Sequence, residues 1–172
     1  MASRRRRKRQ ARRIFRKIKG IWIVKAALYI LGILSFFYTQ RQYEVTIISL
    51  STLLTIGIVG GLLVSLLLER NIRYYLFSII FFGSLCTAAF FWVNKELSGS
   101  DEIKLKQRIL YKALASPTIE HSKVTISFDS FTKDIPISSD QEFSIAQASF
   151  IILTVHPGGL GHYIIVSSEL AK

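Results

Sequence analysis

The feature that most constrains this chain is a set of three long apolar runs within its first 93 residues. They cover residues 21–38, 45–68 and 74–93, and the second and third runs contain no charged residue. A helix needs about 20 apolar residues to cross a hydrocarbon layer about 30 Å thick. The runs therefore predict a transmembrane region over residues 21–93, made of three membrane-spanning helices.

The first run also has features of a cleaved signal peptide, because a basic segment precedes it. It is 18 residues long, however, and it ends in SFFYTQRQYE without the small-residue pattern of a cleavage site. Lys25 lies one turn inside its start, where the charged end of the side chain can reach the headgroups. We therefore expect a permanent anchor.

The orientation of the spans follows from lysine and arginine in the short flanking segments. Residues 1–20 hold eleven of them and no acid, and the ERNIR link between the second and third runs holds two. The TQRQYE link between the first and second runs holds only Arg41. We expect a cytoplasmic N-terminus and an extracytoplasmic domain over residues 94–172, which is periplasmic if the protein belongs to a bacterial inner membrane.

The basic tail over residues 1–20 is the main candidate for a charged contact surface. A polybasic segment beside a span is attracted to anionic headgroups by about 1 kcal/mol per residue. Ile14, Ile18 and Ile21 recur at helical spacing, so we expect the tail to enter the interface as an amphipathic helix. An acidic or RNA partner is the alternative, and nucleic acid is not the expected partner. The predicted lipid and topology determinants are Arg4, Arg5, Arg6, Arg7, Lys8, Arg9, Arg12, Arg13, Arg16, Lys17 and Lys19.

Small residues recur at intervals of four in the second and third runs. Gly57, Gly61 and Ser65 form one such row, and Gly83 with Thr87 forms another. Rows of small residues allow helix backbones to approach closely. We expect packing within the chain, and the alternative is a contact between copies of the chain.

Residues 94–172 are close to neutral, with eight lysines and arginines against nine acids. The patterns in this segment predict a small antiparallel β domain. KVTISFD alternates apolar and polar residues, as a half-buried strand does. DSFTKD is expected to be a turn, IPIS a short strand, and SDQEFSIAQ a loop or one helical turn. ASFIILTV and HYIIVS are rich in β-branched residues and predict two more strands.

The segment IKLKQRILYKALA, which starts at Ile103, is expected to be a short amphipathic helix that connects the membrane region to the sheet. Its first residues also alternate like a strand, so residues 101–114 stay open between helix and strand. The predicted fold class is α+β: three transmembrane helices, a connecting helix, and a small antiparallel sheet of about four strands.

The loop HPGGLGH joins the last two predicted strands. Proline followed by glycine suits a β-turn in which the glycine has positive φ, so Pro157, Gly158, Gly159 and Gly161 predict a hairpin turn. His156 and His162 are weak candidates for a metal site, since two imidazoles are too few for a tight one. A phosphate-binding loop would need a following helix with lysine and serine or threonine, whereas here a strand follows.

The chain offers few groups for catalysis. No predicted span has a central acid, arginine or histidine, and residues 94–172 show no Ser-His-Asp set or paired carboxylates. We therefore expect that the chain is not an enzyme, and that it has no catalytic residue and no cofactor. The expected function is an accessory, assembly or scaffold subunit of a membrane complex, with other membrane proteins as partners. The alternative is a small homo-oligomeric transport or channel-like protein packed through Gly57, Gly61 and Ser65.

Overall fold

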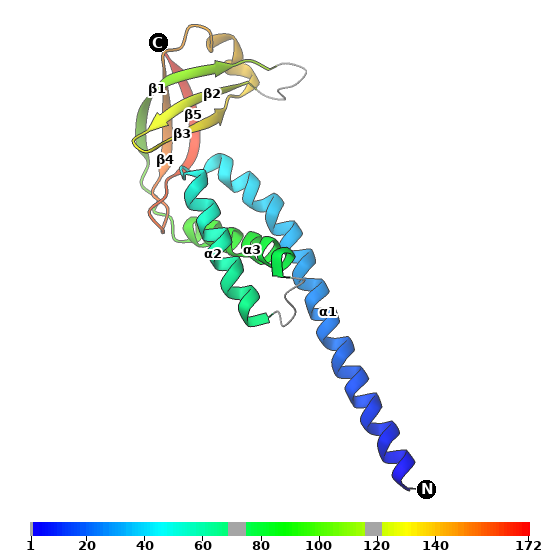
Figure 1. The fold of residues 1–172 in the computed structure, drawn as a ribbon. Helices are drawn as coiled ribbons and strands as arrows, with labels where there is room; N and C mark the ends of the chain where they lie inside the picture. Colours follow the sequence, from blue (N-terminus) through cyan, green and yellow to red (C-terminus); the bar gives the residue numbers. More distant parts are fainter. Residues whose placement is uncertain (1, 69–74, 116–121) are drawn as a thin grey trace.

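Three helices are followed by a five-stranded antiparallel sheet (Figure 1), which confirms the predicted α+β class. This computed structural model describes residues 2–68, 75–115 and 122–172, with side chains from Ile23 onward except Lys25 and Ser139. The elements are α1 (Ala2–Val45), α2 (Leu50–Leu68), α3 (Tyr75–Glu96), β1 (Ile103–Ala113), β2 (Lys123–Phe128), β3 (Phe131–Pro136), the 3₁₀ helix η2 (Ser139–Ser144), β4 (Phe150–His156) and β5 (Ile164–Ala171).

Two of the described helices, α2 and α3, are long and apolar enough to cross a membrane. They have 19 and 22 residues, which correspond to about 28 and 33 Å at 1.5 Å per residue. The first apolar run belongs to α1, and its residues 21, 22 and 25 lie outside the described side chains. A third span therefore stays a prediction.

α1 corrects the predicted link between the first and second spans. It runs without a break from the basic tail through TQRQYE, and its 44 residues correspond to a rod about 66 Å long. The chain reverses at residues 46–49 instead, so α2 begins at Leu50 and not at Val45. The reason is tertiary: Thr46 forms a bridge with Ile164 of β5, which draws this segment out of helical conformation. The N-terminal half of α1 extends beyond α2 and α3 (Figure 1).

α3 packs against both other helices. On the α1 side, the hydroxyls of Tyr29 and Ser78 lie 3.1 Å apart, as do those of Thr39 and Thr87. A Cβ on Gly32 of α1 would lie 2.9 Å from the Cβ of Phe81, closer than side chains tolerate. Hydroxyl pairs and a close backbone approach are typical of helix contacts in an apolar surrounding.

The sheet has the order β3-β2-β1-β4-β5, with every neighbouring pair antiparallel. The predicted connecting helix is wrong, because Ile103–Ala113 forms the central strand β1 between β2 and β4. The prediction of about four strands missed this fifth one. Leu105 and Ile109 point into the core, while Lys106 and Arg108 are exposed. Pairing on both edges stabilises the extended conformation of a segment whose pattern also fits a helix.

One of the predicted loops is shorter than expected. The turn between β2 and β3 contains only residues 129–130, and FTKD belongs to β3 rather than to the turn. In the other, SDQEFS forms η2 and residues 145–147 form a turn, which agrees with the predicted loop or helical turn.

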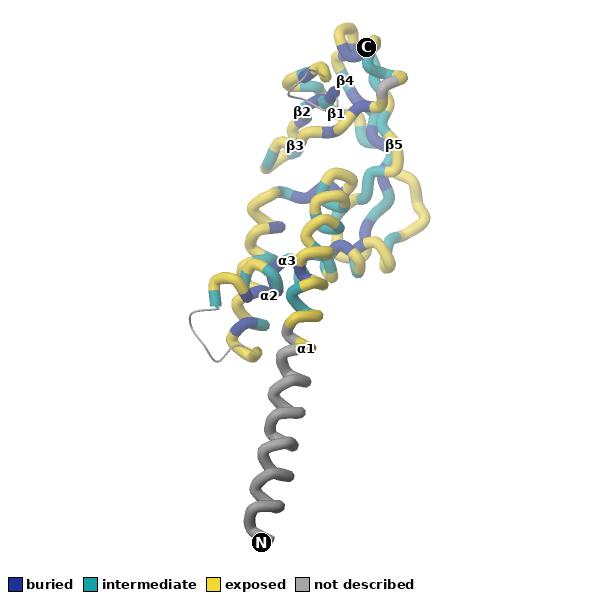
Figure 2. Tube along the Cα trace, turned by 90° about the vertical axis from the view of Figure 1, so that its right-hand side faces the viewer, coloured by how far each residue is buried: buried dark blue, intermediate teal, exposed yellow. Residues whose placement is uncertain are grey.

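The core of the sheet lies on its concave face. Val124, Ile126, Ile151, Leu153 and Val155 are completely buried there, and buried and partly buried positions alternate along β4 (Figure 2). A further buried residue of this core, Ile47, comes from the α1–α2 connection. The helices therefore contribute directly to the core of the sheet.

Candidate functional site

The sheet meets the helices at a junction of three segments. These are the α1–α2 connection at residues 46–49, the end of α3 at residues 94–97, and the β4–β5 loop at residues 157–163. The segments are far apart in sequence. The sheet lies next to the C-terminal end of α1, the N-terminal end of α2 and the C-terminal end of α3 (Figure 1).

Asn94 is the centre of this junction and is 1% exposed. Its side-chain amide Nδ2 donates to the carbonyl oxygen of His162 at 2.9 Å, and its Oδ1 accepts from the backbone N–H of Leu160 at 3.0 Å. Its own carbonyl accepts from the backbone N–H of Gly159 at 2.9 Å. Three hydrogen bonds from one residue therefore attach the β4–β5 loop to the last turn of α3.

Gly158 and Gly159 are required by this close approach and not by their backbone angles. A Cβ on Gly158 would collide with the Asn94 side chain, and one on Gly159 would collide with Leu97. The predicted positive φ lies elsewhere: among the described glycines only Gly161 has one, at 82°. The sequence thus identified the correct loop and glycines but gave the wrong reason for two of them.

His156 and His162 have different neighbours. Nδ1 of His156 lies 3.2 Å from the Asp101 carbonyl oxygen. The ring of His162 packs edge-on against Phe90 of α3, with ring centroids 5.5 Å apart. No group of three or more His, Cys, Asp or Glu within residues 2–68, 75–115 and 122–172 could hold a metal ion. The arrangement of His162 favours a role in docking the loop.

The α1–α2 connection forms the second part of the junction. The backbone N–H of Ile47 donates to the Tyr163 carbonyl at 2.8 Å, beside the bridge between Thr46 and Ile164. Thr46 and Ile48 are 2% and 1% exposed. This connection therefore acts as a short additional edge segment of the sheet.

Lys133 of β3 forms a third attachment. It is 3% exposed, its ammonium donates to the carbonyl oxygen of Tyr43, and it lies 3.8 Å from the centroid of the Tyr43 ring. The last carbonyls of a helix lack partners within the helix, and a cation there also interacts favourably with the helix dipole. Burial lowers the pKa of Lys133 from 10.5 to about 8, while the charges of Glu44 and Asp134 oppose that shift. Lys133 thus caps the end of α1.

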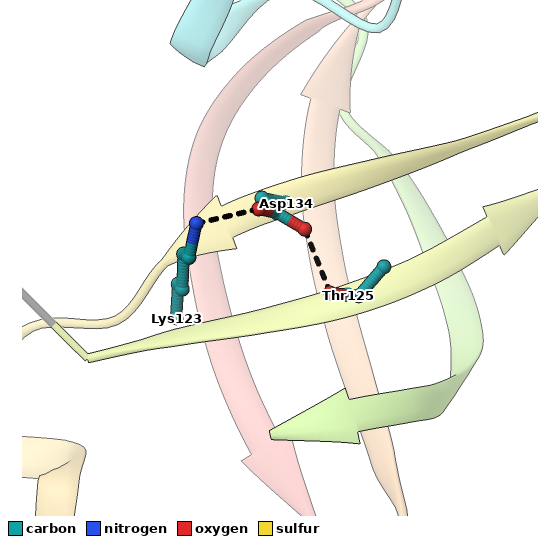
Figure 3. Close-up of polar contacts among 3 residues, drawn as sticks. All are labelled: Lys123, Thr125 and Asp134. Atoms are coloured by element: carbon teal, nitrogen blue, oxygen red, sulfur yellow. Dashed lines mark hydrogen bonds and ion pairs between the residues drawn. The ribbon is translucent and has the colours of Figure 1, made fainter. Parts of the chain in front are cut away.

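The opposite face of the β2–β3 hairpin carries a polar cluster (Figure 3). Lys123 Nζ lies 2.7 Å from one carboxylate oxygen of Asp134, and the Thr125 hydroxyl donates to the other at 2.7 Å. These hydrogen bonds lower the pKa of Asp134. The side chains of Lys123 and Asp134 are 43% and 46% exposed, so this is a cross-strand ion pair of modest strength.

The small residues predicted to pack helices lie between α2 and α3. A Cβ on Gly57 would lie 3.3 Å from Thr87, and one on Gly61 would lie 2.8 Å from the Gly83 nitrogen. Ser65 is fully buried, and its hydroxyl has no hydrogen-bond partner among the described residues.

The basic side chains from Arg4 to Lys19 lie outside the described side chains, although their backbone is part of α1.

Sequence reasoning missed Asn94, Lys133 and residues 46–48. Two signals were present. Asn94 is a polar residue directly after an apolar run, and Lys133 occupies an inward position of an alternating strand. A buried position with a polar side chain requires a partner, but the sequence does not say which partner.

The far side of the sheet from the helices exposes large apolar side chains. We name this the distal surface, and it consists of Leu110, Tyr111, Leu114 and Phe143, with exposed fractions from 55% to 94%. An irregularity in the β1–β2 register between Ile109 and Tyr111 accompanies the outward position of Leu110. The Ser122 hydroxyl accepts from the Ala115 N–H and donates to Glu142, which brings the end of β1 close to η2.

The site thus consists of a buried attachment between helices and sheet, and of exposed apolar side chains on the far side of the sheet.

No known protein family matches this chain, and no match was found among curated proteins or solved structures.

Proposed function

We propose that the chain is an integral membrane protein that displays its sheet on a helical base, as an accessory, assembly or scaffold subunit of a membrane complex. The single observation that carries this proposal is the distal surface. Phe143 of η2 is 94% exposed, and Leu110, Tyr111 and Leu114, at the end of β1 that the Ser122 hydrogen bonds bring close to η2, are more than half exposed. Clustered exposed apolar side chains are typical of protein contact sites.

The junction supports the same function, because it keeps the sheet at a fixed height above the helices. Asn94, Lys133 and residues 46–48 attach the sheet at three separate points. A domain on a flexible linker has no such buried polar attachments. A partner bound at the distal surface would therefore be held at a defined distance from the bilayer.

We further propose that α1 is the third span, with the basic tail and the α2–α3 link in the cytoplasm and the sheet on the other side. The membrane in this proposal is a bacterial inner membrane. Eleven cations in the tail oppose one in the segment that follows the first run. Alkaline phosphatase fused after Lys172 should be active in a bacterial host, and the same enzyme fused before Met1 should be inactive. The reverse pattern would refute this orientation.

The test of the scaffold proposal is co-purification at native abundance. The chain carries its affinity tag at the N-terminus, because the C-terminal Lys172 lies beside Phe143. In mild detergent, we expect a defined membrane protein to co-elute with the wild type and to be depleted by Phe143→Glu. Thr132→Glu, at an exposed polar position of β3, is the matched control and should retain the partner. A monomer without any co-eluting protein contradicts the proposal.

The homo-oligomer built on Gly57, Gly61 and Ser65 has no supporting observation of its own. This face of α2 is covered by α3 within the same chain. An oligomer through this face would require α3 to move away from α2.

A further inference from the structure

We propose that the β4–β5 loop, residues 157–163, is a lipid-contacting tip that sits at the boundary between headgroups and acyl chains on the sheet side of the bilayer. Leu160 of the loop and Leu97 at the end of α3 are its apolar contacts. This inference rests on the proposed membrane function, and it adds a lipid contact made by the sheet itself.

The height of the loop follows from its partners on α3. From Tyr75 to Asn94 the helix rises by about 30 Å, which is about the thickness of the hydrocarbon layer. Asn94 therefore lies at the edge of that layer and holds Leu160 and His162 by hydrogen bonds. The ring of His162 reaches Phe90, one turn further toward the membrane. The loop thus lies beside the last turns of α3 and not above them.

The exposed side chains around the loop suit lipid better than water. Leu160 is 41% exposed and Leu97 is 64% exposed, and the two neighbour each other because Gly159 approaches the Leu97 side chain. Tyr163 of the loop is also exposed, and tyrosine side chains concentrate at membrane surfaces. Residues 157–163 contain no Asp, Glu, Lys or Arg. The loop therefore presents apolar and aromatic side chains and carries no charged side chain of its own.

The backbone of the loop is prepared for a surrounding that offers little water. Pro157 has no amide hydrogen. The N–H groups of the next four residues are all bonded within the protein: Gly158 to His162, Gly159 and Leu160 to Asn94, and Gly161 to Gly158. An unpaired N–H costs several kcal/mol in hydrocarbon, whereas in water it costs little. Internal pairing of these four N–H groups therefore favours a tip that touches the bilayer.

The depth of the loop can be measured by spin labelling. Cys86 is the single cysteine of the chain, so Cys86→Ser provides a background for Leu160→Cys. Two reference positions are Ile58→Cys in the middle of α2, where the isoleucine is 56% exposed, and Phe143→Cys at the distal surface. The full chain is reconstituted into vesicles of phosphatidylcholine with a minority of phosphatidylglycerol. Collisions with oxygen, which is concentrated in lipid, and with a nickel chelate, which stays in water, report the depth of each label.

We expect the label at Leu160 to collide with oxygen more often, and with nickel several-fold less often, than the label at Phe143. It should lie shallower than the label at Ile58. Leu97→Cys provides a second position on the same surface if Leu160→Cys disturbs the fold. Nickel accessibility at Leu160 and Leu97 equal to that at Phe143, with the label at Ile58 still in lipid, overturns this inference alone. An aqueous label at Ile58 as well overturns the proposed membrane function together with it.

Discussion

Replacing Asn94 by alanine should loosen the β4–β5 loop while α2, α3 and the rest of the sheet stay folded. The change removes the hydrogen bonds to the Leu160 N–H and to the His162 carbonyl. A buried polar group left without its partner costs about 1–3 kcal/mol. The bonded groups in the loop are only partly buried, so the lower half of that range applies, about 2 kcal/mol for the pair.

Hydrogen–deuterium exchange of the full chain in detergent micelles measures this free energy locally. A loss of about 2 kcal/mol corresponds to about 30-fold faster exchange, because each 1.4 kcal/mol is tenfold. The acceleration should be confined to amides of residues 157–163 and their neighbours in β5. Lys95→Ala, at the exposed next position of α3, is the matched control and should leave the loop unchanged.

Two results would refute the reasoning about Asn94. Unchanged loop exchange in a folded Asn94→Ala protein would mean that the Gly159 contact alone holds the loop. Equal acceleration in the β2–β3 hairpin would mean global destabilisation instead of a local attachment.

Two further predictions concern the other parts of the junction. Gly159→Val should lower the thermal stability of the purified chain more than the double change of His156 and His162 to glutamine, because any Cβ at Gly159 collides with α3. If zinc stabilised the wild type but not the double variant, a metal site at the two histidines would be indicated instead. Lys133 has a folded pKa of about 8, below the ordinary 10.5, so its burial opposes folding below pH 8 and this cost disappears as pH rises through 10.5. The free energy of unfolding should therefore rise by about 3 kcal/mol between pH 8 and 10.5, relative to Lys133→Met. Denaturant titrations at several pH values measure it. Parallel pH profiles for the two proteins would contradict burial of Lys133 as the cause.

Elements with a strong and local pattern could be predicted from the sequence alone. Uninterrupted apolar runs predicted α2 and α3, since a helix pairs its own backbone groups and needs no partner. Alternation predicted β2, runs of β-branched residues predicted β4 and β5, and proline with glycine predicted the loop between β4 and β5. These features depend on neighbours a few residues apart, so a short window of sequence contains the information.

Only the tertiary structure decided the remaining features. Ile103–Ala113 fits a helix or a strand by pattern, and it becomes a strand because β2 and β4 supply hydrogen bonds on both edges. Residues 46–49 end α1 because β5 supplies a partner for Thr46. Asn94 pairs with a residue 68 positions away, and Lys133 with one 90 positions away. The hydrogen-bond capacity of a polar side chain is visible in the sequence, whereas its partner exists only after the chain has brought distant segments together.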